Sequence, residues 1–270
     1  MKTLYVSDLD GTLLRSDQTL SSYTVETLNN LVEKGMVFSY ATARSYVTSH
    51  KVTEGLNARI PLITSNGAFI VDNVTGENLI SNYFGSEVNG VLDNLIAHDI
   101  YPMVFSNIDS VEKLSFVEEK CTDELKAFLD MRKGDKRLNP VKEVGQLYQE
   151  NIFYILCADK KEKLEPFYHE YKEKYHCVFQ KEMYTGAQWL EILPLETTKA
   201  NAIRQLKDYL QCDKIVVFGD GKNDTDMFEM ADECYAVENA VKELKEMATQ
   251  IIGSNDEDGV VRWLEENYRD

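Results

Sequence analysis

The chain has 270 residues, of which 43% are apolar, and 46 acidic against 29 basic side chains give it a net charge of −17. This length suits one large domain or two ordinary ones, and the apolar content is ample for a sizeable core. The negative charge disfavours nucleic acid and anionic membranes as partners, because both are bound by Lys and Arg that neutralise phosphates. A small anionic substrate stays compatible with it, since one metal ion and a few local cations reverse the potential in a cleft.

The sequence also indicates a compartment. No apolar run is long enough to cross a membrane, and a strand pattern begins almost at the first residue, so we expect neither a signal peptide nor an anchor. The five cysteines are an odd number without paired Cys-x-x-Cys spacing, at positions 121, 157, 177, 212 and 234. We therefore expect free thiols and a cytoplasmic protein.

The first predicted strand, Leu4-Tyr5-Val6-Ser7, runs directly into Asp8-Leu9-Asp10-Gly11. Gly11 allows the chain to turn, which aims a carboxylate and a backbone carbonyl at one point. Two carboxylates at the end of a buried strand are costly unless a cation is bound. This stretch is therefore the first candidate site.

The Asp-x-Asp-Gly pattern alone is weak evidence, because Asp256-Glu257-Asp258-Gly259 repeats it after polar residues. We interpret that second copy as an acidic turn and helix start. The first copy does not fit an EF-hand loop, which needs glycine at its sixth position and Glu at its twelfth, where this chain has Leu13 and Thr19. The strand before the first copy is what makes it informative.

Helices and strands alternate through the next part of the chain. The patterns predict a helix, a strand, a second helix and a third strand at Ser21–Lys34, Met36–Tyr40, about 45–56 and Pro61–Thr64. This alternation indicates an α/β fold with a parallel sheet and right-handed crossovers. Ligands bind at the carboxyl ends of such strands, where the chain places Thr42 with Arg44 and then Asn66. A purely structural Thr42, in a turn or helix cap, is the alternative.

The pattern then becomes irregular. A hairpin is predicted over 69–80, followed from about Tyr83 to Gln188 by helices near 86–98 and 160–175 and strands near Met103 and 152–157. We expect an α+β insert, and hence a core segment at 1–82, a cap domain at 83–188 and a second core segment at 189–270. We interpret the basic cluster Lys133–Arg137 in the insert as a solvated loop; contact with an anionic substrate is the alternative.

The parallel rhythm is predicted to return at Trp189–Leu193, with a helix near 198–210, strands at 215–218, 234–237 and 250–252, and a last helix near 258–267. Lys199, near the start of a helix, opposes the macrodipole, so it needs a partner or a function unless it is simply solvated. Asp220, Asn223 and Asp224 follow the strand at 215–218.

The segment Gly219–Asp224 is not a dinucleotide fingerprint, because Asp224 stands where the third glycine belongs, and it lacks the spacing of a phosphate loop. Its carboxylates would repel phosphate, so metal ligation explains it better. An acidic helix start is the alternative.

At this point the chain resembles a known family. Four motifs are similar, in order, to those of the haloacid dehalogenase (HAD) superfamily: Asp8-Leu9-Asp10-Gly11-Thr12, Thr42, Lys199 and Gly219–Asp224. The insert after Ser65-Asn66-Gly67-Ala68 and the C-terminal segments Glu238–Val241 and Asn255–Val260 resemble the Cof-type, sugar-phosphatase-like branch. Two departures are Ala43, where the family usually has glycine, and the absence of glycines around Lys199. Neither removes a reacting group.

The resemblance implies a fold and a reaction. The fold is a Rossmann-like parallel-sheet core with an inserted α+β cap. The reaction is Mg²⁺-dependent hydrolysis of small phosphate monoesters, with sugar phosphates ahead of pyridoxal phosphate and nucleotides. Asp8 is then the nucleophile, and Asp10 the general acid and base. The metal is bound by Asp8, the Asp10 carbonyl and Asp220, with Asp224 or Asn223 supporting it.

In the same scheme the phosphate oxygens are stabilised by Thr42, Lys199 and amides near Gly11, and the expected phosphate or substrate contacts are Arg44, Asn66 and Asn223. A phosphomutase of the same superfamily is one alternative. A noncatalytic phosphometabolite-binding protein is another, although the chain retains both Asp8 and Asp10. A phosphate-accepting receiver domain is weaker, because the insert exceeds what that module needs. No oligomeric state is predicted.

Overall fold

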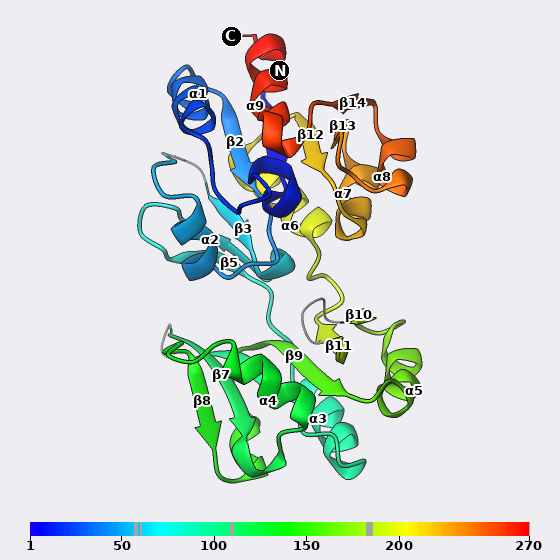
Figure 1. Ribbon diagram of the computed structural model, residues 1–270. Coiled ribbons are helices and arrows are strands. Elements are labelled where there is room, and N and C mark those ends of the chain that lie inside the picture. Colours follow the sequence, from blue (N-terminus) through cyan, green and yellow to red (C-terminus); the bar gives the residue numbers. More distant parts are fainter. Residues whose placement is uncertain (57–58, 60, 109–110, 182–185, 270) are drawn as a thin grey trace. The chain divides into compact units, whose positions relative to one another are not determined.

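The structure is a computed structural model that describes residues 1–56, 59, 61–108, 111–181 and 186–269 (Figure 1). The chain forms two compact units: Met1–Ser81 with Thr197–Asp270, here the core unit, and Asn82–Glu196, here the cap unit. The expected fold class is confirmed, since one unit has a parallel sheet flanked by helices and the other has its own sheet. Within the described ranges, no helix is long and apolar enough to span a bilayer.

A five-stranded parallel sheet of order β14-β13-β12-β1-β2 forms the centre of the core unit. Its strands are β1 (Thr3–Ser7), β2 (Val37–Tyr40), β12 (Lys214–Gly219), β13 (Glu233–Val237) and β14 (Gln250–Ile252). Ser7 lies opposite Phe218 on one neighbour and Tyr40 on the other. The carboxyl ends of β12, β1 and β2 therefore finish at the same level, which places the loops that follow them side by side.

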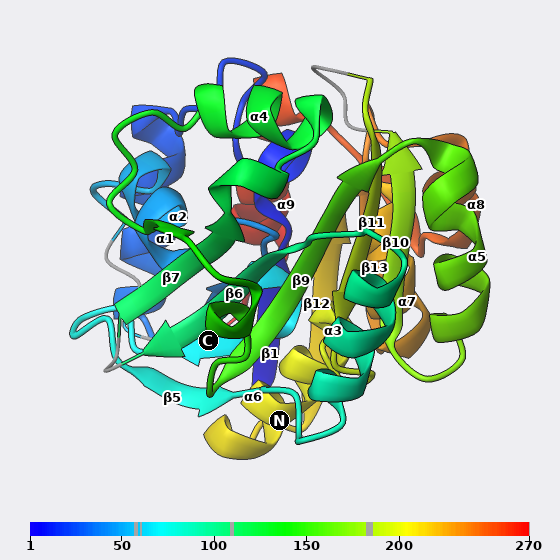
Figure 2. The same ribbon diagram turned by 90° about the horizontal axis from the view of Figure 1, so that it is seen from below.

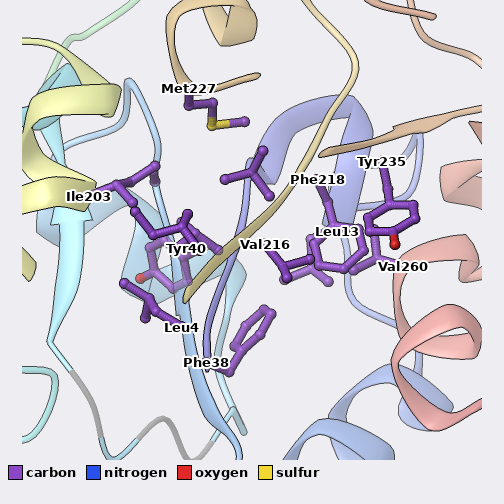
Figure 3. Close-up of a cluster of buried hydrophobic side chains, with 14 of the residues drawn as sticks. Leu4, Leu13, Phe38, Tyr40, Ile203, Val216, Phe218, Met227, Tyr235 and Val260 are labelled. Carbon is purple, nitrogen blue, oxygen red and sulfur yellow. The ribbon is translucent and has the colours of Figure 1, made fainter. Parts of the chain in front are cut away.

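The helices of the core unit bury their apolar faces on this sheet. They are α1 (Ser22–Glu33), α2 (Tyr46–Val52), α6 (Lys199–Leu210), α7 (Thr225–Met230), α8 (Lys242–Met247) and α9 (Gly259–Asn267). Side chains of strands and helices meet in one core (Figure 3), among them Leu4, Phe38, Val216, Ile203, Met227 and Val260. This burial fixes the sheet ends that carry the candidate site.

The third predicted strand of the parallel sheet is only loosely part of it. Among the described residues, the ladder between β3 (Leu62–Thr64) and the main sheet is limited to one parallel bridge, between Ala41 and Ile63. It pairs instead with β4 (Phe69–Val71), which pairs with β5 (Asn78–Ser81), and both pairings are antiparallel. The predicted hairpin is therefore confirmed, whereas the third strand is corrected. A short apolar run does not tell in which direction its partner runs.

The cap unit contains a six-stranded sheet of order β10-β11-β9-β6-β7-β8. The strands are β6 (Met103–Ile108), β7 (Val111–Val117), β8 (Leu138–Val141), β9 (Ile152–Asp159), β10 (His176–Lys181) and β11 (Gln188–Leu193). Helices α3 (Val88–Ala97) and α5 (Lys161–Tyr171) share one apolar cluster with the sheet, and α4 (Asp123–Asp130) shares a separate one (Figure 2).

The prediction that Trp189–Leu193 returns to the parallel sheet is wrong. β11 pairs antiparallel with β9 and with β10, so it belongs to the cap unit, which extends to Glu196. Leu190, Glu191 and Ile192 are all buried. A strand covered on both faces gives the same continuous apolar pattern in either kind of sheet, and this is why the expected boundary at residue 189 fell too early.

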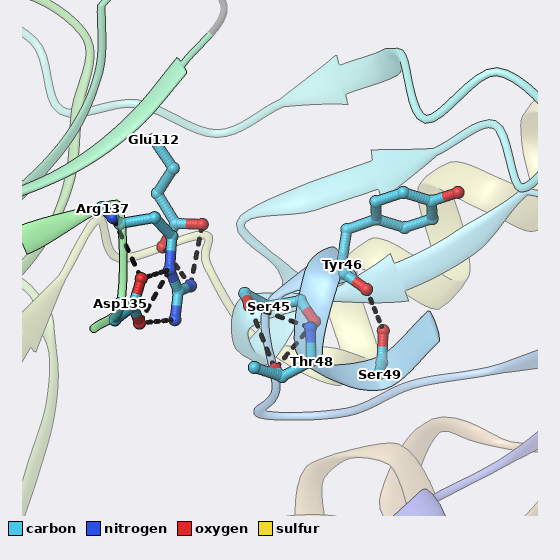
Figure 4. Close-up of polar contacts among 7 residues, drawn as sticks. All are labelled: Ser45, Tyr46, Thr48, Ser49, Glu112, Asp135 and Arg137. Atoms are coloured by element: carbon cyan, nitrogen blue, oxygen red, sulfur yellow. Dashed lines mark hydrogen bonds and ion pairs between the residues drawn. The ribbon is translucent and has the colours of Figure 1, made fainter. Parts of the chain in front are cut away.

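The basic cluster Lys133–Arg137 divides into an exposed and a partly buried part. The Lys133 side chain is exposed and pairs with Asp130. Arg137 instead donates from Nη2 to Asp135 Oδ2 at 2.7 Å and from Nη1 to Glu112 Oε2 at 3.1 Å (Figure 4). The solvated-loop interpretation holds for Lys133, whereas Arg137 cross-links the cap unit.

Figure 4 also shows the start of α2, where the side chain of Ser45 caps the helix.

Candidate active site

Asp8 is the first residue after β1, and the chain turns sharply behind it. Asp10 has φ −74° and ψ 116°, and Gly11 has φ +82°, a left-handed conformation that favours glycine. A Cβ atom on Gly11 would lie 2.5 Å from Asp220 Oδ2. Thr12 Oγ1 donates to Asp220 Oδ1 at 2.9 Å. Gly11 therefore allows the loop after β1 to lie directly against the loop after β12.

Lys199 joins these loops through a buried cation. Its Nζ lies 2.5 Å from Asp8 Oδ1 and 2.8 Å from Asp224 Oδ1, and all three side chains are almost wholly buried. Burial by itself would lower the pKa of Lys199, but the charges of Asp8 and Asp224 raise it above its ordinary value. The lysine is thus a fixed positive charge. The position of Lys199 at the start of α6 led us to expect a partner for its charge, and Asp8 and Asp224 are those partners.

Asp224 holds two parts of the site together. Its Oδ1 accepts from Lys199, and its Oδ2 accepts from the backbone N–H groups of Asp220 at 3.1 Å and Gly221 at 3.0 Å. Asp224 also directly precedes α7, as the acidic helix-start interpretation requires. It is therefore both a helix-start residue and an anchor for the loop that carries Asp220.

Three carboxylates converge in a way that suits a metal ion. One oxygen each of Asp8, Asp220 and Asp224 lie within 4.8 Å of one another. Burial raises the pKa of Asp8 to about 8, a rise that Lys199 opposes, and burial also raises the pKa of Asp220, opposed by Thr12. One ammonium does not balance three carboxylates, so a further cation would offset the remaining charge. Hard oxygen ligands of this kind suit Mg²⁺, and the residues fit the expected metal.

Thr42 and Asn66 lie at the neighbouring strand ends. Thr42 Oγ1 accepts from the backbone N–H of Arg44 at 3.1 Å, which is the turn role named as its structural alternative. The Thr42 carbonyl accepts from the backbone N–H of Asn66 at 2.9 Å. The two predicted residues are therefore adjacent, and their contact with substrate stays a prediction.

Asp10, Arg44 and Asn223 differ from the central cluster. The Asp10 carboxylate is bound by the Arg44 guanidinium through two hydrogen bonds, of 2.8 and 2.5 Å. The Asn223 side chain is exposed and makes no hydrogen bond to a described residue. The structure thus brings Asp8, Lys199, Asp220 and Asp224 together, pairs Asp10 with Arg44, and leaves Asn223 as the predicted contact without a partner inside the described protein.

A turn that sequence reasoning did not identify supports Lys199. Ser65, Asn66 and Gly67 have consecutive positive φ values of 51°, 55° and 95°. A Cβ on Gly67 would lie 2.3 Å from the carbonyl oxygen of Thr198, the residue that caps α6. The left-handed backbone of this turn therefore allows it to lie against the helix that presents Lys199.

Replacing Gly67 by Ala is expected to destabilise the protein by about 1–3 kcal/mol, because the new Cβ meets backbone atoms and the φ value strains an L-residue. The displaced helix start should also lower the hydrolysis of phosphate esters that the family resemblance leads us to expect. Thermal unfolding and phosphate release measure the two effects. Gly134→Ala is the matched control, since Gly134 has a similar φ of 89° and no atom near its Cβ position. Equal unfolding temperatures for the two variants would contradict the role of the Thr198 contact.

Four C-terminal residues, here the C-terminal clamp, also hold the loop after β1. Asn239 Nδ2 donates to the Gly11 carbonyl at 2.7 Å, and Asn255 Nδ2 donates to the Leu14 carbonyl at 3.0 Å. The other two clamp residues are Asp256 and Asp258.

Asp256 accepts from the backbone N–H and the hydroxyl of Ser16 at 2.8 and 2.7 Å. Asp258 accepts from Arg15 Nε and Nη2 at 3.2 and 2.8 Å. The second Asp-x-Asp-Gly copy is a turn before α9, as predicted. It also fixes the segment that follows the first copy. The family resemblance of both clamp segments was the one signal in the sequence.

Comparison with known proteins identifies the family. A family model described as haloacid dehalogenase-like hydrolase matches residues 5–264. The chain belongs to the haloacid dehalogenase-like hydrolases. This confirms the expected superfamily and its Cof-type branch, together with the expected enzyme class, a HAD-type phosphatase.

Two curated relatives and one solved structure span the chain at full length. The 5-amino-6-(5-phospho-D-ribitylamino)uracil phosphatase YwtE of Bacillus subtilis is 30% identical over 96% of each chain. A second phosphatase of that name from the same organism, YitU, is 27% identical over 98% of this chain and 97% of its own. A crystal structure from Thermotoga maritima matches with a TM-score of 0.80 at 27% identity, and the match covers 100% of this chain and 99% of the other. The family relationship thus includes both units.

Proposed function

We propose that the protein is a Mg²⁺-dependent phosphatase that hydrolyses small phosphate monoesters through an aspartyl-phosphate on Asp8. The observation that carries this proposal is the hydrogen bonding of Asp8. Lys199 holds its Oδ1, while no side chain or backbone group in the described ranges hydrogen-bonds its Oδ2. A buried carboxylate held at one oxygen and open at the other is oriented for nucleophilic attack.

The reaction then has two steps. Asp8 forms a bond to phosphorus while the ester P–O bond breaks, and Asp10 gives a proton to the departing oxygen. Asp10 next takes a proton from a water molecule, which attacks phosphorus and releases inorganic phosphate and the free Asp8 carboxylate. General acid–base help of this kind is typically worth about 10²–10⁴-fold in rate. Lys199, whose charge is fixed by its two carboxylates, lies where it stabilises negative charge next to Asp8.

The metal would be held by the carboxylates of Asp8 and Asp220 and by the Asp10 carbonyl, with Asp224 orienting Asp220 and Lys199. A bound Mg²⁺ supplies positive charge that offsets the repulsion between the Asp8 carboxylate and the phosphate. Thr12, through its hydrogen bond to Asp220, fixes the orientation of that ligand. Gly11 keeps the space that the Asp220 carboxylate occupies.

Sugar phosphates are the proposed substrate class. The curated relatives named for 5-amino-6-(5-phospho-D-ribitylamino)uracil add a specific candidate, a phosphate ester of a ribityl chain. A screen should therefore compare this compound with ribose 5-phosphate, glucose 6-phosphate, pyridoxal phosphate and nucleoside monophosphates, scored by kcat/KM. The same screen, analysed for rearranged sugar phosphates as well as inorganic phosphate, separates a phosphatase from a phosphomutase.

Metal removal tests the proposed cofactor. After exhaustive chelation, phosphatase activity is expected to fall below detection and to return when Mg²⁺ is added, because the carboxylates of Asp8 and Asp220 then regain their counter-charge. Saturating Mg²⁺ should also raise the unfolding temperature, since a ligand bound only to the native state stabilises it. Asp220→Asn should weaken both responses. Undiminished activity in metal-free buffer would show that the metal assignment is wrong.

A further inference from the structure

Arg44 and Asp10 form a bidentate ion pair within the core unit. Arg44 Nε donates to Asp10 Oδ2 at 2.8 Å, and Nη2 donates to Asp10 Oδ1 at 2.5 Å. Nη2 also donates to Gln18 Oε1 at 3.1 Å. A planar guanidinium that engages both oxygens fixes the orientation of a carboxylate, which a single point charge does not do.

The backbone of Arg44 is itself fixed. Its N–H donates to Thr42 Oγ1 at 3.1 Å, and its carbonyl accepts from the N–H of Ser65 at 2.8 Å. Gln18 is held in a turn, where its N–H donates to the Arg15 carbonyl at 2.8 Å. The guanidinium therefore extends from an anchored backbone and is hydrogen-bonded to Gln18, which lies in a turn. It is thus already oriented to bind the Asp10 carboxylate.

Stability alone does not explain this geometry. The side chains of Arg44 and Asp10 are 21% and 47% exposed, and ion pairs so open to water contribute little to folding. Across the described ranges, Arg44 is the sole hydrogen-bond partner of the Asp10 carboxylate. Asp10 is also the residue that the reaction requires to exchange a proton with the leaving oxygen, which demands heavy-atom distances of about 2.6–3.2 Å.

We propose that Arg44 is a positioning residue for Asp10, whose carboxylate it holds in the orientation used for proton transfer to the leaving-group oxygen. The inference rests on the proposed function, in which Asp10 is the acid. It is offered in place of the sequence prediction that Arg44 contacts the phosphate or the substrate. Loss of Arg44 should then slow those esters whose leaving group needs a proton, and spare those whose leaving group does not.

A series of aryl phosphates of nearly constant size separates the two roles: phenyl phosphate, p-nitrophenyl phosphate and 2,4-dinitrophenyl phosphate. For each ester kcat/KM reports the steps up to departure of the phenol, and nitro groups reduce the need for a proton. In Arg44→Ala, kcat/KM is expected to fall about 100-fold for phenyl phosphate, the lower end of typical acid catalysis, and less than about threefold for the dinitro ester. Arg44→Lys keeps the positive charge but not the planar guanidinium that engages both carboxylate oxygens, so it should show the same selectivity.

Equal losses on all three esters would overturn the proposal, because they are expected if Arg44 binds the common phosphate. Unchanged kcat/KM in Arg44→Ala would overturn it as well. Gln18→Ala, which removes one partner of the same guanidinium, should give a smaller selective loss. Arg204→Ala, an exposed arginine on α6, is the matched control and should leave all three rates unchanged.

The Asp8→Asn variant distinguishes a failure of the role proposed for Arg44 from a failure of the proposed function. If Asp8→Asn loses all three activities while Arg44→Ala loses them evenly, the phosphatase mechanism stands and only the positioning role fails. If Asp8→Asn turns the esters over at the wild-type rate, the proposed function fails, and the role given to Arg44 fails with it.

Discussion

Asp8→Asn is expected to lower kcat by about 10⁴-fold or more, a loss typical of removing a catalytic nucleophile. Asparagine has nearly the same shape and retains an oxygen that can accept from Lys199, but its amide does not attack phosphorus. The substitution also removes one of the buried carboxylates beside Asp220 and Asp224. The unfolding temperature should therefore stay unchanged or rise. Phosphate release and thermal unfolding followed by circular dichroism measure the two quantities.

The matched control is Asp208→Asn, an exposed position on α6 that should leave activity and unfolding temperature as in the wild type. Wild-type turnover by Asp8→Asn would remove Asp8 as the nucleophile. A large fall in unfolding temperature would contradict the electrostatic account of the site, because that account makes the Asp8 charge unfavourable for folding.

Lys199→Met is expected to destabilise the metal-free protein by about 3–5 kcal/mol, the usual cost of removing one partner of a buried ion pair. Methionine fills a similar volume, so the main effect is electrostatic: Asp8 and Asp224 stay buried without their shared cation. Activity should also be lost, because Lys199 holds Asp8, the proposed nucleophile. Thermal unfolding in the presence of a chelator gives the stability change.

Two further measurements isolate the charge effect. Lys199→Met combined with Asp224→Asn should be more stable than Lys199→Met alone, since one uncompensated carboxylate is removed. Lys242→Met replaces a lysine whose ion pair with Glu246 is exposed, and it should change stability by less than about 1 kcal/mol. If Lys199→Met and Lys242→Met unfold at the same temperature, the buried cation does not have the role described.

Much of the core unit could be predicted because its signals are local. The apolar run before Asp8, the helix over 22–33 and the strand before Asp220 each carry their own periodicity and end signals. Parallel strands share a carboxyl edge, so the convergence of Asp8 and Asp220 follows from the fold class. Lys199 was identified because its charge is unfavourable at a helix start.

The parts that could not be predicted depend on partners distant in sequence. The apolar pattern of Leu190 and Ile192 does not distinguish a cap strand from a core strand, because both are covered on two faces. Nothing in the sequence around Asp256 or Asp258 states that they bind Ser16 and Arg15. The sequence does not predict the pairing of Arg44 with Asp10 either, since each residue alone suits contact with a phosphate ester.

The order of strands in the core sheet has a consequence for how the protein is made. Thr3 pairs with Lys214, and the clamp on the loop after β1 is not complete until Asp258. At about 5–20 residues per second, the ribosome needs roughly 10–40 s between the synthesis of β1 and that of its neighbour β12. All strands of the cap unit come from one continuous segment and emerge within that interval. The cap sheet is therefore complete first, β1 has β2 but not yet β12 as a neighbour, and the candidate active site is the last part of the nascent chain to assemble.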